Sequence, residues 1–138
     1  MASSFEAQIQ RFSDLTMEKA TKVKRTAALN LFSSIIYQTP VLDGYLRNNW
    51  FVTLGSGTTQ TTNDADKTGN STVRRAELVL ATASLPKDIY FTNNLPYAYT
   101  IEFDGHSAKA PDGMVRINLA KWDRFVDSAV SLVNGGTS

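Results

Sequence analysis

The chain contains no cysteine and only one histidine among its 138 residues. Without cysteine it has no disulfide bond, no thiolate nucleophile and no zinc site built on sulfur. The lone histidine, His106, stands in a Gly/Ser turn without the partners that a metal centre or a catalytic triad needs. The glycine patterns of nucleotide-binding loops, G-x-x-x-x-G-K-[ST] and G-x-G-x-x-G, do not occur. We therefore expect no catalytic residue, no metal and no cofactor, and we do not interpret the chain as an enzyme.

Long apolar runs and an excess of charge of one sign are missing as well. No segment approaches the roughly 18 to 20 apolar residues of a membrane span, and we expect neither a signal peptide nor a membrane partner. The 14 basic and 13 acidic residues leave a formal net charge of +1. Such a charge creates no strong global field toward nucleic acid or an anionic membrane. The length is that of one domain, and we expect residues 1–138 to form it.

An apolar stripe with alternating spacings of three and four runs through the first quarter of the chain. It predicts one continuous helix over about residues 4–37. The sequence Thr39-Pro40 ends this helix, because a residue before proline is pushed out of the α region. A helix of about 33 residues would be near 50 Å long, so we expect its first part to project or to pack on a neighbour. The stripe consists of Phe5, Ile9, Phe12, Thr16, Ala20, Val23, Ala27, Leu31 and Ile35.

The rest of the chain predicts two strands and two more helices. Short strands are expected at 50–54 and 88–92, separated by a polar loop at 55–71 and a middle helix at 72–83. The loop has no large apolar residue to anchor it, so we expect it to be flexible. A closing helix over about 112–133 carries an apolar stripe that includes Val115, Leu119, Trp122 and Val126. The fold class is therefore α+β, a small antiparallel sheet packed with a long N-terminal, a middle and a C-terminal helix. We place both tryptophans, Trp50 and Trp122, in the core.

Turn formers and aromatics crowd into residues 92–116, TNNLPYAYTIEFDGHSAKAPDGMVR. Asn and Pro residues end the apolar run of the second strand, and two further turns are expected at 104–105 and 110–113. A chain that fixes its path this closely between packed elements favours a shaped surface for assembly over a catalytic site.

These residues carry a resemblance to a known family. The segment 92–116 resembles the neck or tail-completion proteins of long-tailed bacteriophages, in which a strand ends in N-x-PYA and an AP-x-GMVR turn leads into a closing helix. The segment 39–50, TPVLDGYLRNNW, is similar to the family's T-P-V-x-x-G-x-L-R-x-x-W. One departure is Asp104, which stands where the family usually runs from an aromatic residue directly to glycine. The motif positions in this sequence are Pro40, Gly44, Arg47, Trp50, Asn94, Pro96, Glu102, Gly105, Pro111, Gly113 and Arg116.

The resemblance implies a virion structural protein at the head–tail junction, made in the cytoplasm of a host bacterium. Such a subunit forms a ring that completes the tail and joins it to the head connector, and a hexamer is expected because the tail tube is six-fold. Its partners would be its own copies, the connector or stopper proteins and the tail tube protein. An alternative of the same class is the tail terminator, the ring that stops tube growth.

Several side chains have two interpretations. Tyr97, Tyr99 and Phe103 are most simply core and rim aromatics, or one tyrosine faces a neighbouring subunit. Glu102 forms an exposed ion pair with Arg116 or Arg47, or, as the resemblance implies, it is a buried anchor of the loop 104–113. The candidate interface residues are Tyr97, Tyr99, Asp104, His106, Lys109 and Asp112.

A basic cluster on the first helix supports an alternative from a different class. Four cations lie close together there, although Glu18 is adjacent and such a cluster is usually a solvated helix face. A small nucleic-acid-binding module would use it, and a neck protein could touch the genome passing through the ring. The cluster comprises Lys19, Lys22, Lys24 and Arg25.

Overall fold

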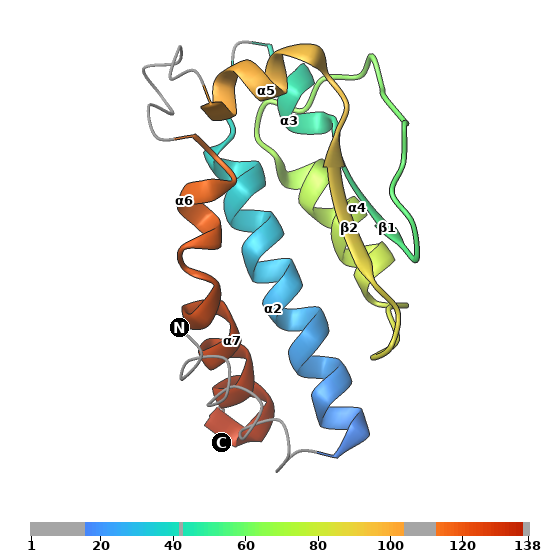
Figure 1. Cartoon of the computed structure of the whole chain (residues 1–138), viewed down its shortest axis with the longest axis vertical. Coiled ribbons are helices and arrows are strands. Elements are labelled where there is room, and N and C mark those ends of the chain that lie inside the picture. Colours follow the sequence, from blue (N-terminus) through green and yellow to red (C-terminus); the bar gives the residue numbers. More distant parts are fainter. Residues whose placement is uncertain (1–15, 42, 104–112, 137–138) are drawn as a thin grey trace.

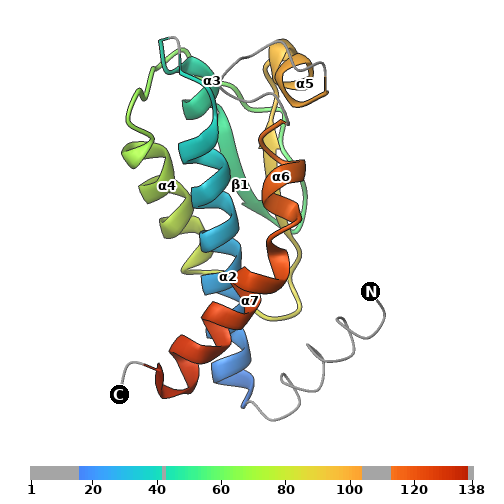
Figure 2. The same ribbon diagram turned by 90° about the vertical axis from the view of Figure 1, so that its left-hand side faces the viewer.

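The computed structural model describes residues 16–41, 43–103 and 113–136, and its fold is α+β, as predicted. Strands β1 (Trp50–Leu54) and β2 (Ile89–Asn93) pair antiparallel, with Trp50 opposite Asn93. The central helix α2 (Met17–Gln38) has α7 (Trp122–Ser131) along one side and α4 (Asn70–Leu80) with the sheet on another (Figures 1 and 2). The remaining elements are α3 (Tyr45–Asn48), α5 (Pro96–Phe103), α6 (Arg116–Leu119) and the kinked turn η1 (Leu132–Gly136). No helix among the described residues is long and apolar enough to cross a membrane.

Helix α2 contributes to two apolar clusters and therefore buries more than one stripe. The predicted stripe residues from Ala20 to Ile35 are buried, and so are Ala28, Phe32 and Ile36 on a neighbouring face. The main cluster lies between α2, the sheet and α4, and it includes Trp50, which is 6% exposed. The smaller cluster joins α2 to α7 through Val23, Ala27, Val126 and Ala129.

The prediction of one continuous first helix is wrong at its start. Thr16 has an extended backbone, with φ −67° and ψ 162°, and its hydroxyl accepts a hydrogen bond from the Lys19 N–H at 3.1 Å. Although Thr16 fits the spacing of the apolar stripe, threonine is a favourable N-cap and here begins a new helix. Residues 1–15 lie outside the described part of the chain. The helix from Met17 has 22 residues and is about 33 Å long, so the expected 50 Å is also wrong.

The prediction of one closing helix is wrong as well, because the chain breaks between α6 and α7 at Lys121 (φ −98°, ψ 7°). Two stripe residues that we expected in the core are exposed, Leu119 at 51% and Trp122 at 37%. A polar residue orients α6 instead. The buried Asn118 accepts a hydrogen bond from the Ser34 hydroxyl on α2 and donates one to the Met114 carbonyl at 2.7 Å.

The polar loop after β1 has no large apolar anchor, as its composition indicates, but side-chain amides of two asparagines hold it. The Asn49 side chain donates to the Thr62 carbonyl and accepts from the Thr62 N–H, both at 3.0 Å. Asn94 donates to the carbonyls of Thr58 and Gln60 at 2.9 and 3.0 Å. Side-chain amides thus satisfy backbone groups that no apolar residue covers. The flexibility of the loop stays a prediction.

Candidate interaction surface

The two segments that carry the family resemblance meet at one end of the molecule, where α3 and α5 lie at the top of Figure 1. The Asn93 side chain at the end of β2 donates to the Leu46 carbonyl in α3 at 2.9 Å. Trp50 faces Asn93 across the sheet, and its indole N–H donates to the Thr39 hydroxyl at 2.9 Å. Hydrogen bonds and strand pairing therefore join the two segments to each other in space.

Arg47 and Gly44 fix the first of these segments. The Arg47 guanidinium donates to the carbonyls of Tyr37 and Thr39, both at 2.8 Å, and to the Lys67 carbonyl at 2.6 Å. Gly44 has φ +92°, and a Cβ atom there would lie 2.8 Å from the Asp66 carbonyl carbon. Both residues hold the end of α2 against the chain that enters α4, so their role is structural.

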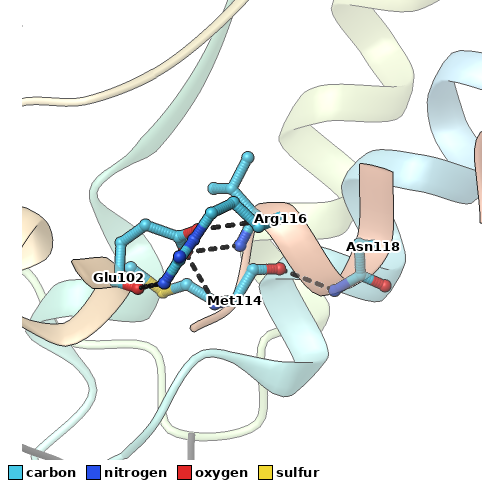
Figure 3. Close-up of polar contacts among 5 residues, drawn as sticks. Glu102, Met114, Arg116 and Asn118 are labelled. Carbon is cyan, nitrogen blue, oxygen red and sulfur yellow. Dashed lines mark hydrogen bonds and ion pairs between the residues drawn. The ribbon is translucent and has the colours of Figure 1, made fainter. Parts of the chain in front are cut away.

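Glu102 anchors the second segment. Only 6% of it is exposed, and its Oε1 atom accepts from the N–H groups of Met114 and Val115, both at 2.7 Å. Its Oε2 atom accepts from the N–H and the Nε of Arg116, both at 2.9 Å, and Figure 3 shows this set, which we call the Glu102 clamp. Glu102 is therefore buried, as the second interpretation expected, and an exposed ion pair with Arg47 is wrong. That Glu102 anchors the loop 104–113 stays a prediction, because residues 104–112 lie outside the described part of the chain.

Gly113 lets the clamp close. It has φ +87°, and a Cβ atom there would lie 2.7 Å from the Glu102 carbonyl oxygen and 2.9 Å from its carboxyl carbon. An alanine at this position would therefore be strained in its backbone and would push the carboxylate away. The close approach of Glu102 therefore explains why the AP-x-GMVR pattern has a glycine at this position.

The two buried carboxylates are held ionised. Burial alone would raise the pKa of Glu102, but the hydrogen bonds from Val115, Arg116 and Met114 lower the pKa below its usual range. Asp66 is 8% exposed, and burial opposes its ionisation in the same way. Hydrogen bonds from the hydroxyl and N–H of Thr72 lower the pKa of Asp66 instead.

These lowered pKa values predict that acid destabilises the fold. A carboxyl group with a lower pKa in the folded state stabilises the fold above its unfolded pKa, about 3.9 for Asp and about 4.3 for Glu, and this contribution is lost as the pH falls through the folded pKa. We expect the urea midpoint to fall steeply from pH 4.5 to pH 2.5 and to vary little between pH 5 and 7. A Glu102→Gln variant should lose part of that slope. Urea titrations at each pH test this, and parallel acid slopes for the two proteins would contradict it.

Helix α5 exposes its aromatic side chains. Tyr97 is 44% exposed, Tyr99 66% and Phe103 51%, so the core part of the core-and-rim interpretation is wrong for all three. The rings of Tyr99 and Phe103 lie 4.6 Å apart, and the Arg116 guanidinium lies 4.8 Å from the Phe103 ring centre. We call Tyr99, Phe103 and Arg116 the aromatic surface. The ring contact joins Tyr99 to Phe103 and does not include Tyr97; burial, and then the charge of Asp43, raise the pKa of Tyr97.

The basic cluster of the first helix is only partly free. Lys24 donates to the carbonyls of Leu85 at 2.7 Å and Ser84 at 3.3 Å, and Arg25 donates to the Ala83 carbonyl at 2.7 Å. Lys22 pairs with Glu18 at 3.5 Å. The interpretation as a solvated helix face is therefore wrong for Lys24 and Arg25, whose charges stabilise the turn after α4.

Some predicted residues cannot be placed. The interface candidates Asp104, His106, Lys109 and Asp112 and the motif positions Gly105 and Pro111 lie outside the described residues, and their roles stay predictions. No protein-family model, no curated protein and no solved structure matches the chain. The function is therefore inferred from the resemblance of the two segments and from the contacts that they make.

Proposed function

We propose that this chain is a ring-forming structural subunit at the head–tail junction of a tailed bacteriophage, where it completes the tail and joins it to the head connector. The observation that carries the proposal is the aromatic surface, which stands beside the Glu102 clamp at the end of the molecule where both motif segments meet. The proposed ring is a hexamer of this chain, with the connector or stopper proteins and the tail tube protein as its neighbours.

The chemistry of the aromatic surface suits a protein partner. Tyr, Phe and Arg are enriched at protein–protein interfaces, where rings and guanidinium groups dominate the binding energy. Tyr99 and Phe103 are more than half exposed, although burial of such rings is strongly favourable. The clamp fixes the guanidinium over the ring, so little side-chain freedom remains to be lost on docking. A contact from this surface to a different patch of the next copy would be heterologous, and such contacts form a ring when the rotation between successive copies closes.

We expect Tyr99→Ser and Phe103→Ser to weaken self-association without harming the fold. Loss of an interface hot spot costs about 2 kcal/mol or more, which corresponds to roughly a 30-fold weaker contact for each residue. The change in folding stability should stay within about 0.5 kcal/mol, because both side chains are exposed. Native mass spectrometry and light scattering give the ring size, and thermal melting gives the stability.

Leu78→Ser is the matched control, since Leu78 is an exposed side chain of α4, 63% exposed. Rings that persist in both aromatic variants would remove the aromatic surface from the interface. Electron microscopy of particles separates a neck ring from a tail terminator by its position relative to the tube. A DNA affinity that falls steeply with salt, without ring formation, would replace the proposal with the nucleic-acid-binding alternative.

A further inference from the structure

A hollow of about 370 Å³ runs along the first three turns of α2. Residues of α2 between Met17 and Ala27 line this hollow. Trp122 and Val126 of α7 and Leu85 of the segment before β2 also line it. The walls are largely apolar. Met17 is 69% exposed and Trp122 is 37% exposed, so two large apolar side chains face solvent at this hollow, which we call the α2 groove.

The α2 groove suits apolar side chains better than a charged ligand. Lys24 also lines it, but its ammonium group is bound to the carbonyls of Ser84, Leu85 and Lys87. This cation is therefore engaged with backbone oxygens and is not presented to an incoming anion. A groove with these walls favours a partner that inserts several apolar side chains along one line.

Residues 1–15 end where the α2 groove begins. Phe5, Ile9 and Phe12 are spaced by four and three residues, a spacing that would put the three side chains on one face, over about 10 Å, if this segment is helical. The stretch of α2 from Met17 to Ala27 is about 15 Å long, so it can accommodate these three side chains.

We propose that Phe5, Ile9 and Phe12 fill the α2 groove of their own chain. Residues 13–16, which include the turn formers Ser13 and Asp14, would form the connection of an antiparallel helical hairpin. Because this connection is so short, the segment meets its own groove at an effective concentration in the millimolar range, well above that of a neighbour's segment. The docked segment covers Met17 and Trp122. The proposal does not depend on ring formation.

The absence of cysteine allows a direct test in the full chain. In the variant Ile9→Cys/Leu85→Cys, we expect a disulfide to form within the monomer under mild oxidation. The control Ile9→Cys/Tyr45→Cys places the second thiol on α3, at the far end of the molecule from the start of α2 (Figure 1), and should react at least tenfold more slowly. Adding Phe5→Ser and Phe12→Ser to the first pair should also slow the reaction at least tenfold. Non-reducing electrophoresis and peptide mass spectrometry identify the product.

Two results would overturn the proposal. Disulfide-linked dimers or ladders that persist on dilution would show that the segment occupies a neighbour's groove. Equal rates for the test pair and the control would show that the segment does not dock there. A second measurement uses Trp122 fluorescence in a Trp50→Phe background, where Phe5→Ser/Phe12→Ser should raise acrylamide quenching about twofold. Unchanged quenching would contradict the docked state.

Discussion

Replacing Trp50 with alanine is expected to destabilise the protein by about 5 kcal/mol, because a truncated buried aromatic costs about 3 to 5 kcal/mol and leaves a cavity. Trp50 is 6% exposed and stacks on Phe91 with ring centres 4.5 Å apart. Its indole N–H also donates to the buried Thr39 hydroxyl, which would lose this partner at the end of α2. Since a small domain is stable by only about 5 to 15 kcal/mol, much of the variant should be unfolded at 37 °C. Urea unfolding followed by circular dichroism measures the loss.

Trp122→Ala is the matched control for this prediction. The same substitution at a side chain that is 37% exposed should cost clearly less, about 1 to 2 kcal/mol, because Trp122 lies outside the main core cluster. Trp50→Phe keeps an aromatic ring against Phe91 but removes the hydrogen bond to Thr39, and should cost about 1 to 2 kcal/mol. Equal losses for the two alanine variants would contradict the placement of Trp50 in the core and Trp122 at the surface.

The sheet and the end of the first helix could be predicted because their determinants are local. Strand β1 has the predicted bounds, and β2 begins one residue later than expected. Apolar residues that alternate along the chain predict that a strand forms there, although Phe51, between Trp50 and Val52, is buried as well. Pro40 predicts the end of α2 for an equally local reason, because it restricts the backbone of Thr39. The C-cap of α2 is indeed Thr39.

The start of α2 and the break before α7 could not be predicted, because other contacts override the apolar period there. Thr16 continues the spacing of the stripe, yet its hydroxyl caps the helix at Lys19. The period through Leu119 and Trp122 is equally regular, but the buried Asn118 sets the position of α6 against α2. A period of 3.6 residues reports which side chains share a face and not whether the helix is interrupted.

The sequence also predicted the candidate surface only in part. The resemblance implied that Glu102 is buried, and the structure supports this through three backbone donors that lie 12 to 14 residues further along the chain. The stacking of Arg116 on Phe103 has no signal in the sequence, because it depends on how α6 lies beside α5. The contact of Asp66 at the start of α4 had a weak signal in the sequence, since Asp66 stands three residues before Gly69. Its carboxylate accepts a hydrogen bond from the Gly69 N–H at 3.1 Å.

Glu102→Ala is expected to destabilise the protein by about 3 to 5 kcal/mol, the range for removing one partner of a buried charged network. Most of this loss should come from the backbone, because the N–H groups of Met114, Val115 and Arg116 would lose their acceptor. Each such group costs about 1 to 3 kcal/mol where water cannot replace the acceptor. The ion pair itself contributes less, since the Arg116 side chain is 54% exposed and solvent screens it.

The control Glu77→Ala removes an exposed carboxylate from α4 and should change stability by no more than about 0.5 kcal/mol. Glu102→Gln should fall between the two, because an amide oxygen accepts from some of the same donors but carries no charge. If the clamp holds the aromatic surface in place, Glu102→Ala should weaken both folding and ring formation. Tyr99→Ser, in contrast, should weaken ring formation alone. A Glu102→Ala variant with unchanged melting and unchanged assembly would show that the carboxylate neither supports α6 nor positions Arg116 over Phe103.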